Sequence, residues 1–252
     1  ILRRAKGAEA VIVNKTPLSA ETIGALLPEL RYIGVLATGF NVVDIAAAKA
    51  AGIPVCNIPT YGTTAVAQFA MALLLELCHQ VGLHNQDVHQ GSWTENGSFT
   101  YWLTPQMELA GKTMGIIGLG HIGMAAAKLA EAFGMDVLAY TRTEKKGIRC
   151  VSLDTLLERA DVISLHCPLL PETNQLICRE TIGKMKDGVI LLNTSRGGLV
   201  NEGDLAEALK SGKLRGAAVD VVTQEPMAHD NPLLTAPNCI ITPHMAWAPV
   251  ES

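Results

Sequence analysis

Three ionisable side chains of complementary chemistry follow three predicted strands in the second half of the chain. Arg196 follows residues 189–194, Glu225 follows residues 217–222, and His244 closes residues 239–244. The carboxyl ends of parallel strands meet at one edge of a sheet, where ligands bind. An arginine there can bind and polarise an anionic carbonyl compound, a histidine can donate a proton near neutral pH, and a glutamate can keep that histidine charged and oriented. Each residue alone also fits a structural role, as a turn residue, a phosphate contact or a packed histidine, but together they indicate a catalytic set.

A glycine-rich turn joins a predicted strand to a predicted helix near the middle of the chain. Gly118, Gly120 and Gly123 form G-x-G-x-x-G between residues 113–117 and a helix over 124–133. The first glycine permits the turn, the second lets the backbone approach a pyrophosphate, and the third allows close packing of helix on strand. This context predicts a dinucleotide site, with His121 contacting the cofactor through its backbone only. Hydride transfer to a 2-keto acid would use the cation, proton donor and carboxylate of the catalytic set.

The residues that follow the next predicted strand bear on the choice of dinucleotide. That strand, 135–140, ends on Thr141-Arg142-Thr143, where an acidic residue would hold the ribose hydroxyls of NAD. The missing carboxylate removes repulsion of a 2′-phosphate, and Arg142 could pair with one. The pattern favours NADP over NAD; the alternative is a solvated Arg142 and bound NAD.

Short β-branched runs alternate with amphipathic stretches along the whole chain, which is typical of a parallel α/β sheet. The second half offers six strands, as expected of a doubly wound Rossmann-type domain; they lie near 114–119, 135–141, 161–166, 188–194, 215–221 and 238–242. The first part offers three, at 10–13, 31–37 and 54–57, with helices near 20–27 and 44–51. A helix over 64–78 is apolar almost all round, so we expect it to be buried on every side, inside a domain or against a second subunit. The polar, weakly periodic residues 84–106 are interpreted as an arm or linker.

Composition excludes several classes of protein. The 252 residues are 48% hydrophobic and 17% charged with a net charge of −4, and no Lys/Arg cluster suggests nucleic acid. The most apolar run, 65–78, is too short to span a membrane. Six scattered cysteines without a C-x-x-C pair predict buried thiols in a reducing, cytoplasmic compartment, and no metal site is expected. No targeting segment is visible, which is weak evidence in a chain that starts without Met.

Six motifs in order resemble those of the D-isomer-specific 2-hydroxyacid dehydrogenases. They are G-L-G-H-I-G (118–123), D-V-I-S-L-H-C-P-L (161–169), L-L-N-T-S-R-G (191–197), A-V-D-V (218–221), E-P (225–226) and P-H-M-A-W (243–247). The resemblance runs from about residue 30 to the end of the chain. Within the family, residues 61–68, 101–102 and 243–247 are similar to the glycerate dehydrogenases, or hydroxypyruvate reductases.

The resemblance implies a role for each matching residue. Arg196 would bind substrate, His244 would be the acid/base, Glu225 would be its partner, and backbone N–H groups near Thr38 and Gly39 would hold the substrate carboxylate. Pro168 would lie by the adenine, Thr173 near the phosphates, and Thr194 with Asp220 near the nicotinamide. The expected cofactor-binding residues are Gly118, Gly120, His121, Ile122, Gly123, Thr141, Arg142, Cys167, Pro168, Thr173, Asn193, Thr194, Ser195, Asp220 and His244.

The resemblance also implies a domain plan. A flavodoxin-like substrate lobe (1–62), truncated at both chain ends, would precede a dimerisation helix and arm (63–106), a dinucleotide-binding domain (107–244) and the start of a return crossover (245–252). We expect a homodimer with the substrate, hydroxypyruvate or glyoxylate, in the interdomain cleft. The alternatives are pyruvate or a bulkier 2-keto acid, and, from another class, a dinucleotide-sensing, corepressor-like scaffold. The intact Arg/Glu/His set disfavours the scaffold, because function follows the site rather than the fold.

Overall fold

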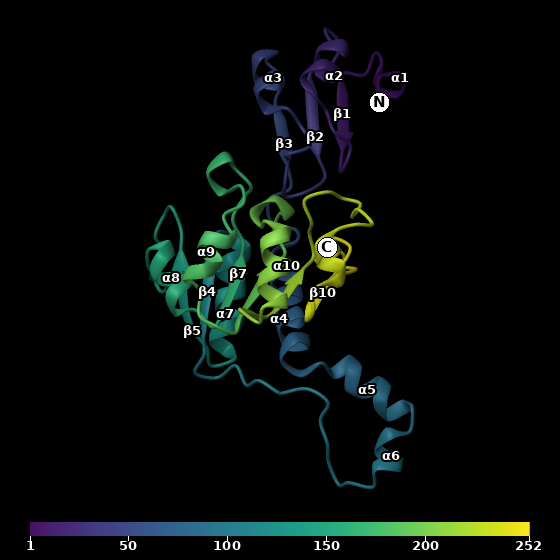
Figure 1. Cartoon of the computed structure of the whole chain (residues 1–252). Coiled ribbons are helices and arrows are strands. Elements are labelled where there is room, and N and C mark those ends of the chain that lie inside the picture. Colours follow the sequence, from purple (N-terminus) through teal and green to yellow (C-terminus); the bar gives the residue numbers. More distant parts are fainter. Residues whose placement is uncertain (252) are drawn as a thin grey trace. The chain divides into compact units, whose positions relative to one another are not determined.

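The chain divides into two units, which the computed structural model describes over residues 1–251 (Figure 1). The first unit is Ile1–Gly62, and the second begins at Thr63. Ser252, the last residue of the predicted return segment 245–252, lies outside the described residues.

The first unit is a small parallel α/β layer. Its three strands pair in the order β1-β2-β3, with β1 at Ala10–Val13, β2 at Tyr32–Val35 and β3 at Val55–Asn57. Its helices are α1 (Leu2–Ala5), α2 (Ala20–Ala25) and α3 (Ile45–Ala50). Ser19 and Asp44 cap α2 and α3 through bonds from the amides of Thr22 and Ala47, which satisfy first-turn N–H groups.

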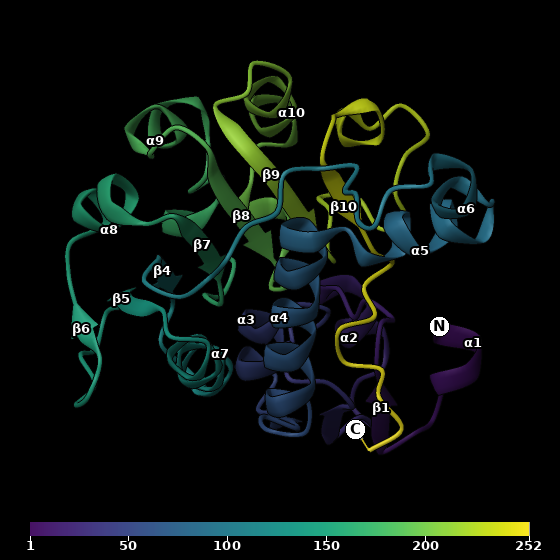
Figure 2. The ribbon, with the colours of Figure 1, turned by 90° about the horizontal axis from the view of Figure 1, so that it is seen from below.

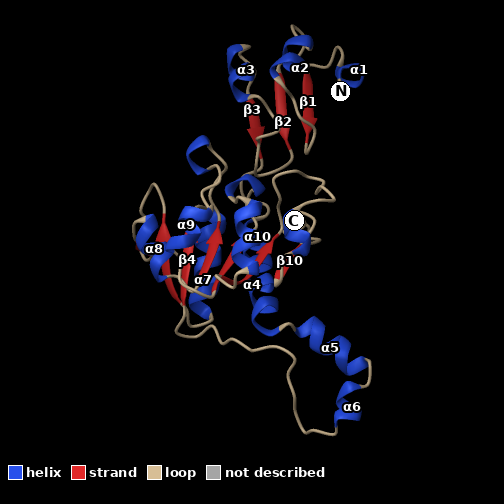
Figure 3. Ribbon diagram, viewed as in Figure 1, coloured by secondary structure: helices blue, strands red, loops and turns tan. Residues whose placement is uncertain are grey.

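The second unit is built on a seven-stranded parallel sheet of order β10-β9-β8-β7-β4-β5-β6. Figure 3 draws the strands in red and the surrounding helices in blue. The strands are β4 (Thr113–Ile117), β5 (Asp136–Tyr140), β6 (Arg149–Cys150), β7 (Val162–Leu165), β8 (Val189–Asn193), β9 (Leu214–Val219) and β10 (Cys239–Ile241). The chain runs outward from β4 in one direction and from β7 in the other, so the topological switch point lies between β4 and β7. The predicted number of six strands was wrong. The seventh, β6, pairs two residues with Leu138 and Ala139, and two residues carry no readable period.

Helices cover both faces of this sheet (Figure 2). One face carries α4 (Thr63–His79) and α7 (His121–Ala132), and the other carries α8 (Leu153–Arg159), α9 (Arg179–Lys184) and α10 (Glu202–Lys210). Short 3-10 turns lie at Pro171–Thr173 (η1), Gly197–Leu199 (η2) and Pro232–Thr235 (η3). The strands β7 and β8 are buried along their whole length, as expected where both faces are covered.

The structure adds to two expectations about the helices. Helix α4 buries one side, but Thr64, Gln68 and Ala72 on another side are exposed, so the chain alone does not cover it all round and burial against a second subunit stays a prediction. The arm contains two helices, α5 (Val81–His89) and α6 (Ser92–Asn96), which no hydrophobic period signals because neither has a buried residue. No single helix in the described residues is long and apolar enough to cross a membrane; α4 and α5 meet that test only together, with a bend of 56° between them.

Candidate active site

The glycine loop lies at the switch point, between β4 and α7. Gly118 has a φ of +97°, and a Cβ there would lie 2.6 Å from the Cys167 amide nitrogen, so only glycine fits. A Cβ on Gly123 would collide with the Gly118 carbonyl oxygen. Around Gly120, by contrast, a Cβ would meet open space. Gly120 is also the N-cap of α7 and has no side chain to cap it, so the first-turn N–H groups of this 12-residue helix, which includes His121 and Ile122, suit an anionic group.

The residues after β5 form a turn with a basic surface. The Thr143 amide donates to the Thr141 hydroxyl oxygen at 3.4 Å, and that hydroxyl donates to the Thr143 carbonyl at 3.3 Å. Arg142, Lys145 and Lys146 are exposed in this segment.

The Asn-Thr-Ser-Arg segment after β8 is braced from within. The buried Asn193 side chain donates to the Arg196 carbonyl at 2.9 Å and accepts from the Ser195 amide at 3.1 Å. The Ser195 hydroxyl donates to the Cys167 carbonyl at 2.6 Å, which ties this turn to the end of β7. Arg196 donates from Nη1 to the Ser195 carbonyl at 2.7 Å. Asn193 and Ser195 therefore shape the turn that carries Arg196.

Glu225 and His244 form an ion-pair geometry beside this turn. His244 Nδ1 lies 2.6 Å from Glu225 Oε2, and the second carboxylate oxygen, Oε1, accepts from the Val222 amide at 3.2 Å. The side chains are 26% and 37% exposed, so the pair is open to a ligand. Since Nδ1 faces the carboxylate, Nε2 is the nitrogen placed to exchange a proton with substrate.

Asp220 holds the backbone around His244. This buried carboxylate accepts from the Thr242 hydroxyl at 2.6 Å and from the amides of Met245 and Ala246 at 2.9 and 2.8 Å, while the His244 amide donates to the Asp220 carbonyl at 2.8 Å. His244 sits in the left-handed region at φ +54°, a conformation that a non-glycine residue keeps only when its surroundings enforce it. The sequence motif suggested a nicotinamide contact for Asp220 but did not reveal this bracing.

The segment after β7 is held by short-range bonds. The Thr173 hydroxyl donates to the Pro168 carbonyl at 2.7 Å and accepts from the Leu170 amide at 2.8 Å. Burial raises the pKa of the Cys167 thiol to about 11. Burial also lowers the pKa of His166 to about 4, and its Nε2 lies 2.8 Å from the Ser164 hydroxyl. His166 is therefore neutral near pH 7, although its side chain is only partly buried.

The remaining predicted substrate residues lie in the first unit. Thr38 and Gly39 follow β2 at its carboxyl end. The Thr38 hydroxyl donates to the Ile58 carbonyl at 3.1 Å, and the Asn57 side chain donates to the Thr38 carbonyl at 2.7 Å. These bonds fix the turn after β2 against the residues that follow β3.

The second unit fits a nicotinamide dinucleotide on observations of its own atoms. The Thr194 hydroxyl is buried and has no hydrogen-bond partner, although buried polar atoms are normally paired. It lies on the turn after β8, at the same sheet edge as the glycine loop, and a ligand amide or hydroxyl would satisfy it. The open space at Gly120 and the uncapped start of α7 suit the phosphates.

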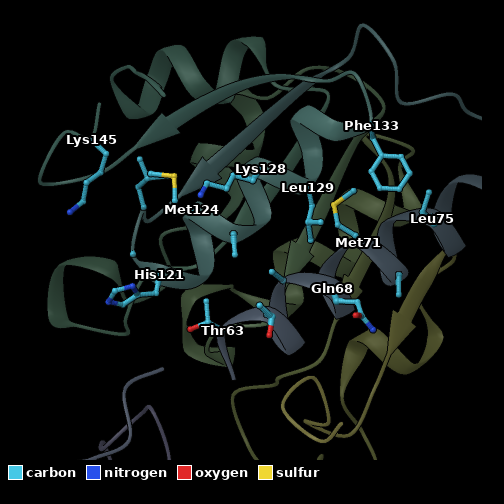
Figure 4. A pocket seen from close by; sticks show the side chains of 16 residues that line it. Thr63, Gln68, Met71, Leu75, His121, Met124, Lys128, Leu129, Phe133 and Lys145 are labelled. Atoms are coloured by element: carbon cyan, nitrogen blue, oxygen red, sulfur yellow. The ribbon is translucent and has the colours of Figure 1, made fainter. Parts of the chain in front are cut away.

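An apolar groove of about 990 Å³ runs between α4 and α7. Figure 4 shows Leu75 and Phe133 at one end of it and His121 and Lys145 at the other. Sequence analysis expected this face of α4 to be buried and did not identify a groove.

Two further polar residues near the pair were missed from the sequence. The Glu202 carboxylate accepts from the Asn231 side chain and from the backbone amide of Thr223, close to Glu225. Glu202 and Asn231 lie 29 residues apart in the chain. No motif in the sequence marked either residue.

The switch-point glycine loop and the strand-end Arg, Glu and His side chains define the class: a dinucleotide-binding domain that carries proton-transfer groups. Residues 71–246 match the family model described as the NAD binding domain of the D-isomer specific 2-hydroxyacid dehydrogenases. The chain is 56% identical over its whole length to a hydroxypyruvate reductase of Blautia hydrogenotrophica and 45% identical to a glycerate dehydrogenase of Methylorubrum extorquens, covering 80% of each.

Solved structures agree with these relatives. The chain superposes with a TM-score of 0.89 on the D-lactate dehydrogenase of Aquifex aeolicus complexed with NAD and lactic acid, at 33% identity, with 100% of this chain and 80% of that one covered. It superposes with a TM-score of 0.87 on the acyclic imino acid reductase Bsp5 in complex with NADPH and D-Arg, at 30% identity, with 99% and 79% covered. The chain belongs to the D-isomer specific 2-hydroxyacid dehydrogenase family. It is an oxidoreductase with a nicotinamide dinucleotide cofactor, as the sequence predicted.

Proposed function

We propose that this protein reduces a small 2-keto acid of the hydroxypyruvate or glyoxylate type to the D-2-hydroxy acid with NADPH or NADH. The observation that carries the proposal is the 2.6 Å contact between His244 Nδ1 and Glu225 Oε2. Glu225 follows β9, which pairs with β8, and the turn after β8 bears Arg196. A histidine fixed in this way at the ligand-binding edge of a dinucleotide domain is suited to proton transfer.

Each residue has one task in this reaction. Arg196 binds the substrate carboxylate and carbonyl through its planar guanidinium. A dinucleotide bound at the glycine loop would supply the hydride that C2 of the keto acid accepts. His244 donates the Nε2 proton to the oxygen that becomes the hydroxyl, and Glu225 stabilises the charged imidazole and fixes its orientation. Backbone amides near Thr38 and Gly39 are proposed to bind the substrate carboxylate as well.

We favour NADP as the coenzyme. Thr141 leaves the end of β5 without the carboxylate that would bind the ribose hydroxyls of NAD and repel a 2′-phosphate. Arg142, Lys145 and Lys146 put three exposed positive charges in the same segment, against the single carboxylate of Glu144. A guanidinium can form charge-assisted bonds to a phosphate there.

The substrate assignment is supported by the names of the two relatives, which act as a hydroxypyruvate reductase and a glycerate dehydrogenase. Initial rates of NADPH and NADH oxidation with hydroxypyruvate, glyoxylate and pyruvate test it in the full-length protein. Fast turnover with hydroxypyruvate is expected. Turnover only with pyruvate or a bulkier keto acid would change the substrate assignment and leave the proposed reaction standing. Dinucleotide binding without turnover of any keto acid would contradict the proposed reaction and favour a scaffold.

We also propose that the protein is a homodimer. The groove between α4 and α7 is apolar and uncovered, and the neighbouring arm exposes Phe99 by 94% and Trp102 by 68%. In a twofold dimer the exposed aromatic side chains of one copy's arm could cover the apolar groove of the other copy, and the reverse. Light scattering should give a dimer for the wild type and for the exposed control Ala46→Glu, and a monomer for Ala72→Glu; a monomeric wild type would contradict the proposal.

Free thiols support a reducing, cytoplasmic location, which stays a prediction. All six cysteines are unbridged. The expectation that they are buried is met by Cys78 and Cys167, only in part by Cys150, Cys178 and Cys239, and was wrong for Cys56, which is exposed.

A further inference from the structure

Helix α10 presents a carboxylate to the loop that carries Glu225. Glu202, the first residue of α10, accepts from the Thr223 amide through Oε1 at 2.6 Å and from the Asn231 side chain through Oε2 at 2.7 Å. Thr223 and Asn231 lie at the two ends of the segment in which Glu225 sits. One side chain therefore closes this loop at its base.

Asn231 is itself held in one orientation. It is buried, only 8% exposed, and its Oδ1 accepts from the Leu233 amide at 3.0 Å, so its Nδ2 must point to Glu202. Leu233 lies in the turn η3, which packs against α10. Both anchors of the Glu202 carboxylate are thus fixed by the fold rather than by flexible side chains.

The peptide unit between Val222 and Thr223 connects the Glu202 carboxylate to the catalytic set. Thr223 donates its amide to Glu202, and the preceding amide, that of Val222, donates to Glu225 Oε1. The other carboxylate oxygen of Glu225, Oε2, faces His244. The same peptide unit packs directly against Gly197, where a Cβ would collide with it. Since Gly197 follows Arg196, movement of the 222–223 peptide would disturb Arg196 and Glu225 together.

We infer that Glu202 is a positioning residue for the proposed reaction: it fixes the 222–223 peptide and the base of the 223–231 loop, and thereby keeps Glu225 on His244. The inference rests on the proposed function for its kinetic consequence and on geometry alone for its effect on His244. An ordinary first-turn acidic residue would only stabilise α10. Asp204, an acidic residue on the same first turn, bonds instead to the backbone and side chain of Arg179 at the start of α9, away from the loop that carries Glu225.

The variants Glu202→Ala and Glu202→Gln separate the two roles, with Asp204→Asn as the matched control. Alanine removes both bonds. In the glutamine variant the carbonyl oxygen can still accept from the Thr223 amide, but the NH2 group cannot accept from the NH2 group of Asn231. Asn231 cannot turn its oxygen to the new side chain instead without losing its bond from the Leu233 amide. We expect kcat with hydroxypyruvate to fall roughly 10- to 100-fold in Glu202→Ala and less in Glu202→Gln, as a small misplacement of catalytic groups would cause, with dinucleotide Kd unchanged. Asp204→Asn should keep the wild-type kcat.

A second readout needs no turnover. The His244 ring signals can be recorded by NMR in the holoprotein at one fixed pH and identified by their loss in His244→Asn. In Glu202→Ala the signals of the Nδ1–H group should move away from their wild-type positions, because the Glu225 carboxylate no longer stays hydrogen-bonded to the ring. Unchanged His244 signals in a folded Glu202→Ala protein, or an equal change in Asp204→Asn, would overturn the inference. A wild type that reduces no keto acid would overturn the proposed function and leave this NMR test standing.

Discussion

His166, a partly buried histidine directly after β7, makes the stability of the second unit depend on pH. Burial lowers the pKa of His166 from 6.5 to about 4. The unfolded chain therefore binds a proton more readily than the folded one between these values. The free energy of unfolding is therefore unaffected by His166 protonation above pH 6.5, and it falls as the pH drops from 6.5 towards 4 because protons bind preferentially to the unfolded chain. At pH 5 the loss, relative to pH 8, comes to about 2 kcal/mol.

Urea unfolding of the apoprotein at pH 8, 7, 6 and 5, followed by circular dichroism, measures this loss. His166→Gln removes the titrating group, so its free energy of unfolding should fall between pH 8 and 5 by about 2 kcal/mol less than that of the wild type. His229→Gln, which removes an exposed histidine, should keep the wild-type dependence. Comparing the pH dependence rather than the absolute stability removes the packing cost of the substitution.

The pH window identifies the group responsible. Burial acts to raise the pKa of Asp161, but bonds from the Thr113 amide and Lys186 outweigh it and hold that pKa below 3.8. The contribution of Asp161 is present above pH 3.8 and is lost only at lower pH. If His166→Gln lost stability between pH 8 and 5 as steeply as the wild type, the reasoning about His166 would be wrong.

Two further predictions concern the coenzyme and the thiols. Arg142→Ala should raise the KM for NADPH about tenfold and leave that for NADH nearly unchanged, because only the 2′-phosphate loses a charge-assisted bond; equal effects on both coenzymes in initial-rate measurements would refute a phosphate contact. Burial raises the pKa of Cys78, Cys167 and Cys239 to about 11, so these thiols should react slowly with iodoacetamide at pH 8. Mass spectrometry should find the exposed Cys56 labelled first, and rapid labelling of Cys167 would contradict its burial.

The parallel sheets could be predicted because their signals are local. Runs such as residues 189–192 are continuously apolar and β-branched residues are frequent in them, and glycine-bearing turns separate them from helices. The glycine loop was recognisable because its three glycines meet steric demands at fixed spacing. The arm was harder, because α5 and α6 bury nothing and so carry no hydrophobic period.

For the candidate site, the sequence indicated which residues to consider and placed each of them at the end of a strand, but it did not indicate the contacts between them. Arg196, Glu225 and His244 stood out because each follows a strand, and the structure places Glu225 on His244. The bracing by Glu202 and Asp220 was not predictable. It depends on side chains that reach the backbone 21 to 26 residues away, and no spacing rule in a single sequence encodes such a contact.

The central claim is that His244 donates the proton in keto-acid reduction. The most direct test is the kcat of His244→Ala in the full-length protein with hydroxypyruvate, with dinucleotide Kd measured on the same preparation. The account predicts a fall in kcat of about 10²- to 10⁴-fold with Kd unchanged, because proton transfer is lost while the glycine loop is intact. Near-normal turnover by this variant would contradict the account.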